Sequence, residues 1–108
     1  DWMGVGVLHR NASRMAALDL GFYQANPIKN SIDKIYNDIA SGETNTVILY
    51  GADEIEMEKL GGSFVIYMGH HGDKAAYKAD VILPIAAYTE KSGSYINLNG
   101  LIQRTHKA

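Results

Sequence analysis

The chain has 108 residues, of which 46% are hydrophobic and 20% are charged, and its formal net charge is −2 at pH 7. This length suits one small hydrophobic core, so we expect a single domain over residues 1–108. The charge gives no reason to expect a nucleic-acid partner, no apolar run approaches the roughly 18 residues of a membrane span, and no secretory signal is visible.

The sequence contains no cysteine. Disulfides and cysteine-ligated zinc are therefore excluded, and we expect no iron–sulfur cluster, because Cys thiolates normally hold such clusters. A chain without disulfides fits a reducing compartment. The sequence begins at Asp1 rather than Met and ends directly after a strand-like run, so we expect it to be a piece of a longer polypeptide.

Two helices are predicted in the first half of the chain. Ser13 suits the N-cap of a short helix over residues 14–20, which Gly21 would end in the left-handed conformation. A longer helix is expected to open at Asn26-Pro27, because proline is favoured in the first turn, and to end at Gly42. Its apolar positions recur at helical spacing and form one stripe, made of Ile28, Ile32, Ile35 and Ile39.

Three nearly unbroken apolar runs follow, at residues 46–50, 64–68 and 81–83. Continuous runs are typical of strands that are buried on both faces, as in parallel sheets. The segments between them have 13 and 12 residues, about the minimum for a parallel crossover, and contain short helical candidates at 54–60 and 74–78. The pattern predicts an α/β fold, a Rossmann-like parallel sheet of about three strands with crossover helices.

A β-hairpin is predicted at the C-terminal end of this domain. Asn99-Gly100 lies between two short β-prone runs, residues 94–98 and 101–105. Asn-Gly between such runs favours a type I′ turn, in which both central residues have positive φ.

The carboxyl ends of the predicted strands are the candidate ligand site, since open parallel sheets bind ligands there. The candidate residues follow the first two strands and are Gly51, Ala52, Asp53, Gly69, His70, His71, Gly72 and Asp73. Glycine-bearing loops would let a ligand approach the backbone closely. The alternative is structural: glycines let the chain leave a strand abruptly, and aspartates cap the next helix. From the residues alone we favour this alternative.

Neither a metal site nor a catalytic residue is expected. His70 and His71 are adjacent, so in an extended backbone their side chains would point to opposite sides. The remaining histidines, His9 and His106, are distant in sequence. Hydrogen bonding between loops or contact with a partner would suit the histidine pair better than metal binding.

Some residues of the second half admit both a functional and a structural interpretation. Glu90-Lys91 could form an acid–base pair, but exposed neighbours of opposite charge are usually solvated. Tyrosine is favoured at protein interfaces and is also common in cores. Four tyrosines raise this question, namely Tyr67, Tyr77, Tyr88 and Tyr95.

Three separated blocks of the chain resemble a known family. Residues 79–84, with Glu90 to Gly93, Asn97, Asn99-Gly100 and Gln103, are similar to the signature of the molybdopterin oxidoreductase superfamily. Within this superfamily, three further stretches make the resemblance more specific, namely residues 67–73, 86–92 and 8–21. Together these blocks resemble the large iron–sulfur subunits of respiratory complex I, the G chain or 75 kDa subunit of NADH:quinone oxidoreductase.

The resemblance implies a part of the C-terminal, molybdopterin-oxidoreductase-like region of such a subunit. In that family, iron–sulfur clusters that carry electrons from NADH towards quinone lie in the cysteine-rich N-terminal portion, so this chain would hold none. It implies a structural domain with vestigial strand-end loops and no bound cofactor. Its partners would be other complex I subunits and the rest of its own chain. It would lie in the peripheral arm, on the cytoplasmic side of the bacterial inner membrane or the matrix side in mitochondria, without direct membrane insertion.

One position departs from the superfamily pattern. An arginine commonly follows the motif that ends at Gly100, and Leu101 stands there in this chain. An apolar side chain thus replaces a guanidinium that could bind an anionic or pterin ligand.

Two other hypotheses remain open from the residues. The first is a cofactor-holding domain of a true molybdopterin oxidoreductase such as a formate dehydrogenase, in which the strand-end loops hold a pterin guanine dinucleotide. The second is a generic nucleotide-binding module, which only the fold class favours.

Overall fold

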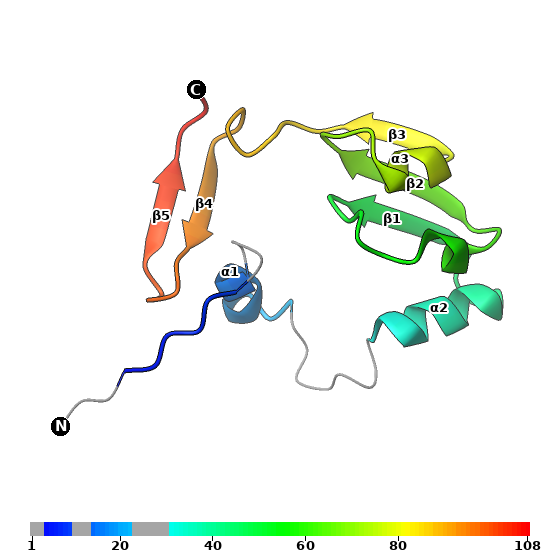
Figure 1. Ribbon diagram of the computed structural model, residues 1–108, viewed down its shortest axis with the longest axis horizontal. Coiled ribbons are helices and arrows are strands. Elements are labelled where there is room, and N and C mark those ends of the chain that lie inside the picture. Colours follow the sequence, from blue (N-terminus) through cyan, green and yellow to red (C-terminus); the bar gives the residue numbers. More distant parts are fainter. Residues whose placement is uncertain (1–3, 10–13, 23–30) are drawn as a thin grey trace. The chain divides into compact units, whose positions relative to one another are not determined.

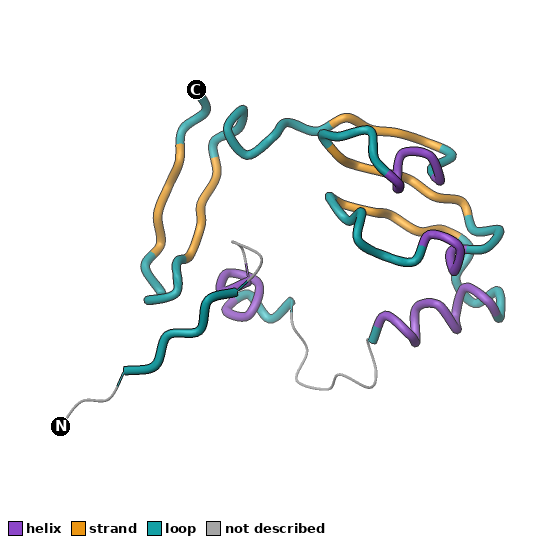
Figure 2. Tube along the Cα trace, viewed as in Figure 1, coloured by secondary structure: helices purple, strands orange, loops and turns teal. Residues whose placement is uncertain are grey.

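The computed structural model describes residues 4–9, 14–22 and 31–108. The contacts divide the chain into two compact units, residues 26–87 and residues 1–25 with 88–108. The single domain over residues 1–108 stays a prediction. Figures 1 and 2 show the elements of both units along the chain.

The unit of residues 26–87 contains a three-stranded parallel sheet (Figure 1). Its elements in chain order are α2 (Ile32–Ala40), β1 (Thr46–Tyr50), the 3₁₀ helix η1 (Met57–Leu60), β2 (Phe64–Gly69), α3 (Lys74–Lys78) and β3 (Val81–Pro84). The strand order is β1-β2-β3, and both neighbouring pairs are parallel. This confirms the predicted α/β class, the three strands and the crossover arrangement.

The hydrophobic core lies on one face of this sheet. Leu49 of β1 and Val65 and Tyr67 of β2 share that face and are at most 4% exposed. The helices contribute the rest of the core, which consists of Tyr36, Ile39, Met57, Leu60 and Ala75. The continuous apolar runs predict strands buried on both faces, but within the described residues α2, η1 and α3 all supply their buried residues to the same core on one face.

Helix α2 begins later than the sequence predicts. Ser31 is its N-cap and accepts a hydrogen bond from the Lys34 backbone N–H at 3.2 Å. Gly42 follows the helix with φ +80°, as predicted for its end. The predicted opening at Asn26-Pro27 lies outside the described residues.

The buried face of α2 also differs from the predicted isoleucine stripe. Ile39 is buried, but Ile32 and Ile35 are 45% and 43% exposed. Tyr36 enters the core instead, and its hydroxyl accepts a hydrogen bond from the Glu56 backbone N–H at 3.0 Å. This polar contact lets a buried tyrosine fasten the helix to the segment before η1.

The other unit contains α1 (Arg14–Asp19), β4 (Gly93–Ile96) and β5 (Ile102–Thr105). Helix α1 is one residue shorter than predicted, and Gly21 follows it with φ +73°. The predicted N-cap, Ser13, lies outside the described residues. Strands β4 and β5 pair antiparallel, which confirms the predicted hairpin.

The turn of this hairpin is not of type I′. Gly100 has φ +77°, but none of the described non-glycine residues has a positive φ, so Asn99 does not meet the requirement. The Asn97 side chain closes a longer loop instead. Its Oδ1 accepts hydrogen bonds from the backbone N–H groups of Asn99 and Leu101, at 3.0 and 2.9 Å.

Leu60 tests the position of the core. Leu60→Ala should lower the free energy of unfolding by about 2–5 kcal/mol, because this side chain is 1% exposed and its removal leaves a cavity. Leu83→Ala is the matched control, since Leu83 is 46% exposed and should cost clearly less. Denaturant unfolding measures both variants, and an equal loss would contradict this placement of the core.

Candidate functional site

The two predicted loops lie together at one edge of the parallel sheet. Tyr50 pairs with Met68 at the ends of β1 and β2, so the loop after each strand leaves from the same edge. The Gly51 N–H donates a hydrogen bond to the Met68 carbonyl oxygen at 2.7 Å. At the third strand, the Ile85 N–H donates to the Gly69 carbonyl oxygen at 3.1 Å. The structure therefore brings the predicted residues to one place in the fold.

Both aspartates of the loops bind the first turn of α3. Asp73 is its N-cap, and its Oδ1 accepts a hydrogen bond from the Lys74 N–H at 3.1 Å. Asp53 comes from the other loop, and its Oδ1 accepts from the N–H of the fully buried Ala75 at 2.5 Å. Asp73 therefore caps the helix that follows it, as the structural alternative predicts. Asp53 instead crosses to a helix 22 residues away, a contact that the sequence did not indicate.

Tyr67 occupies the space beside Gly69. A Cβ at Gly69 would overlap the ring and hydroxyl of Tyr67, which lies two positions earlier on the same side of β2. The Tyr67 side chain is 4% exposed, and its hydroxyl donates a hydrogen bond to the His71 carbonyl oxygen at 3.1 Å. Gly69 therefore makes room for a side chain of its own strand, and Tyr67 holds the start of the second loop.

The two adjacent histidines contact each other. The ring centroids of His70 and His71 are 4.3 Å apart, with an interplanar angle of 69°. The expectation that they point to opposite sides is wrong, because the chain has left the extended strand conformation at these positions. In the described parts of the chain, no group of three or more His, Cys, Asp or Glu side chains is arranged to hold a metal ion.

The remaining candidate residues are divided between the two units. His9, Glu90, Lys91 and His106 belong to the other unit. Among the tyrosines, Tyr67 is a core residue, whereas Tyr77 and Tyr88 are 90% and 71% exposed. The core interpretation therefore holds for Tyr67, and the exposed pair is available for contact with other molecules.

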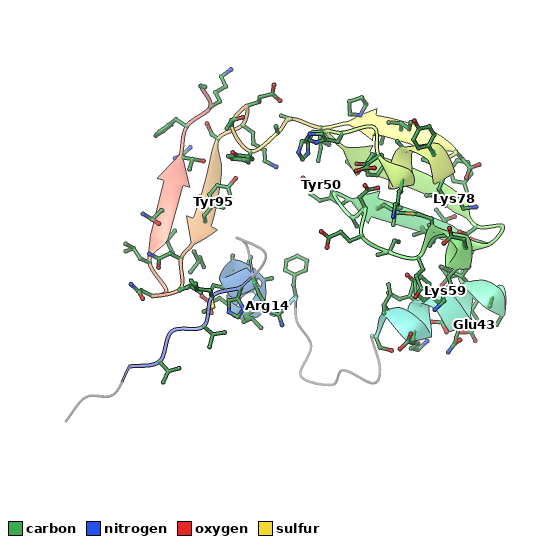
Figure 3. All side chains as sticks on the ribbon, in the orientation of Figure 1. Arg14, Glu43, Tyr50, Lys59, Lys78 and Tyr95 are labelled. Atoms are coloured by element: carbon green, nitrogen blue, oxygen red, sulfur yellow. The ribbon has the colours of Figure 1, made fainter. Side chains whose placement is uncertain are left out.

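A hollow of about 510 Å³ lies between α2 and η1, and the sequence reasoning did not anticipate it. The Lys59 ammonium lies above the Tyr36 ring there, 5.0 Å from its centroid (Figure 3 labels Lys59). A hydrogen bond with Glu56 raises the pKa of Lys59. The hollow takes in none of the strand-end residues, and its lining is Asp33, Tyr36, Asn37, Ile39, Ala40, Glu58, Lys59, Gly61 and Gly62.

Comparison with known proteins places the chain in a family. The profile of the family described as molybdopterin oxidoreductase matches residues 1–108. The chain therefore belongs to the molybdopterin oxidoreductase family.

Its similarity to individual proteins is more specific. The chain is 47% identical over 111 residues to the mitochondrial NADH-ubiquinone oxidoreductase 78 kDa subunit of Candida albicans. It is 45% identical to the G subunit of the NADH-quinone oxidoreductase of Rickettsia bellii and 44% identical to the NADH-ubiquinone oxidoreductase 75 kDa subunit of Reclinomonas americana, each over 108 residues. All three alignments cover 100% of this chain, and they cover 14%, 14% and 15% of the relatives.

These comparisons confirm the resemblance that the three sequence blocks indicate. Within the family, the chain is similar to the G and 75 kDa subunits of NADH:quinone oxidoreductases. None of the helices in the described residues has the length and apolar character required to cross a bilayer.

Substitution of Gly69 tests the contact with Tyr67. Gly69→Ala should lower the free energy of unfolding by about 1–3 kcal/mol, because the added methyl group displaces a buried ring. Gly72→Ala is the control, since a Cβ there meets nothing within 4 Å. In a Tyr67→Val background, Gly69→Ala should cost less. Additive losses in this double-mutant cycle, measured by chemical denaturation, would refute the contact.

Asp53 tests the link between the two loops. Asp53→Ala should destabilise the chain by about 0.5–2 kcal/mol, the usual cost of a lost helix cap, because the buried Ala75 N–H loses its acceptor. Glu54→Ala, at an exposed neighbouring position, should have little effect. Hydrogen exchange of the Ala75 amide gives a local readout, and unchanged protection in Asp53→Ala would disprove the cap.

Proposed function

We propose that this chain is a structural domain of the G subunit of NADH:quinone oxidoreductase, respiratory complex I. The parent subunit takes part in electron transfer from NADH to quinone, and this part of it carries no redox centre and no catalytic residue. The iron–sulfur clusters belong to the N-terminal portion of the parent subunit. The proposal rests on the family, on the similarity to G and 75 kDa subunits, and on the construction of the strand-end loops.

The observation that carries the proposal is the position of Tyr67 beside Gly69. A glycine at a strand end can admit a ligand only if the space above its Cα is open. Here the buried Tyr67 ring takes that space, and its hydroxyl is hydrogen-bonded to His71. A ligand that needed the backbone at Gly69 would first have to displace a core side chain.

Two carboxylate groups of the loops are also engaged within the fold. Asp53 and Asp73 both accept backbone hydrogen bonds from the first turn of α3. Because Tyr67 blocks Gly69 and these carboxylates bind α3, we infer that the strand ends do not fit a pterin guanine dinucleotide, whose phosphates and hydrogen-bonding groups need accessible donors and acceptors. Leu101 supports the same conclusion from the other unit, because an apolar side chain stands where the family commonly has arginine.

The partners we propose are other complex I subunits and the rest of the parent chain. We place the domain in the peripheral arm, on the cytoplasmic side of the bacterial membrane or the matrix side in mitochondria, without insertion into the bilayer. The exposed tyrosines, Tyr77 and Tyr88, suit such protein contacts, since tyrosine combines a large apolar body with a polar tip. The vestigial loops then serve to position α3 on the sheet.

The alternative, a cofactor-holding domain of a true molybdopterin oxidoreductase such as a formate dehydrogenase, is not favoured. The similar proteins are named as NADH oxidoreductase subunits, and both loop aspartates are engaged within the fold. Metal analysis of the natural, full-length protein after native purification separates the two. We expect iron without stoichiometric molybdenum or tungsten, and stoichiometric molybdenum or tungsten would overturn the proposal.

Variants within the complex test the absence of a catalytic role. His70→Ala with His71→Ala should leave NADH:quinone turnover per assembled complex unchanged, because the proposed structural role gives these exposed, mutually contacting rings no part in the reaction. Val65→Asp is the comparison variant, since it places a carboxylate in the core and should lower the amount of assembled complex. Loss of turnover in the histidine variant at full assembly would contradict a purely structural role.

A further inference from the structure

The second face of the parallel sheet is apolar and uncovered by the described residues of its own unit. Apart from Thr46 at one end, its residues are hydrophobic on all three strands; we call this the open face, and it consists of Ile48, Tyr50, Phe64, Ile66, Met68, Val81 and Leu83. Ile48 and Tyr50 are 61% and 65% exposed. The strand register places them beside Ile66 and Met68, so the patch is continuous.

The topology explains why this face is left open. The chain advances from β1 to β2 to β3 in one direction across the sheet. Crossovers between parallel strands are right-handed in nearly all proteins, so two connections that advance in the same direction lie on the same face. The buried residues of η1 and α3 accordingly belong to one core. In doubly wound sheets a helix covers the opposite face where a connection runs the other way, to a strand beyond β1.

The outer edge of β1 is suited to such a strand. Among the described residues, β1 pairs with β2 alone. Its sequence is Thr-Val-Ile-Leu-Tyr, without charge, proline or glycine. Strands that remain at the edge of a sheet usually carry lysine, proline or a bulge, which prevent further pairing. By contrast, β3 is a short strand that follows Asp80 and ends at Pro84.

We propose that a further parallel strand of the same subunit pairs with the outer edge of β1 and that its crossover helix covers the open face with an apolar stripe. This occupant is polypeptide outside residues 1–108. The relatives are long enough to contain such a strand and helix, because this chain spans only 14–15% of the three relatives described above. The inference goes beyond the proposed function and does not depend on whether the subunit holds a redox centre.

Photo-crosslinking in the natural, full-length polypeptide identifies the occupant. A benzophenone amino acid in place of Tyr50, which Figure 3 labels on β1, should crosslink to a peptide of the same polypeptide outside residues 1–108. The same probe in place of Tyr77, at an exposed position on α3, is the matched control and should not yield that crosslink. A crosslink from position 50 to residues 1–25 or 88–108, to another subunit or to a second copy, or no crosslink, would overturn the proposal.

Amide hydrogen exchange of the unsubstituted full-length protein tests the added strand without any substitution. If β1 is paired on both sides, the amides of residues 47–50 should all exchange slowly. If β1 is an edge, alternate amides point away from β2 and should exchange rapidly, which would contradict the proposal. The metal content of the same sample tests the proposed function separately, so the two can fail independently.

Discussion

Parallel pairing of β1, β2 and β3 is the constraint on which the rest of the larger unit depends. Parallel strands need crossovers, and right-handed crossovers that advance in one direction must pack on one face. This requirement places η1 and α3 over a single core, which α2 completes through Tyr36 and Ile39. It also sends the two glycine-bearing loops to the same edge and leaves the opposite face apolar and open.

At the loop edge, three side chains make contacts that stabilise the fold. Asp53 and Asp73 cap α3, and Tyr67 passes over Gly69 to reach the His71 carbonyl group. These contacts engage both carboxylates and the Tyr67 hydroxyl within the fold.

The sequence predicted the elements whose signals are local. Strand β1 and helix α3 have the predicted bounds, because an uninterrupted run of residues with high β propensity and an Asp N-cap act over a few residues. The hairpin was predicted correctly, but its predicted turn type was wrong. The Asn97 side chain accepts two backbone hydrogen bonds across the loop, and these contacts are not visible in the local sequence pattern. The buried face of α2 was likewise misjudged, since the partner of Tyr36 lies 20 residues away at Glu56.

By itself, the sequence determined the α/β class, the family, the absence of cysteine chemistry and the loops that meet at the sheet edge. These follow from composition, periodicity and residue blocks, which need no knowledge of distant contacts. Only the tertiary structure decided what those loops do. The Asp53 contact with Ala75, the overlap of Tyr67 with Gly69 and the one-sided core all join segments whose packing is set by the register and handedness of the sheet.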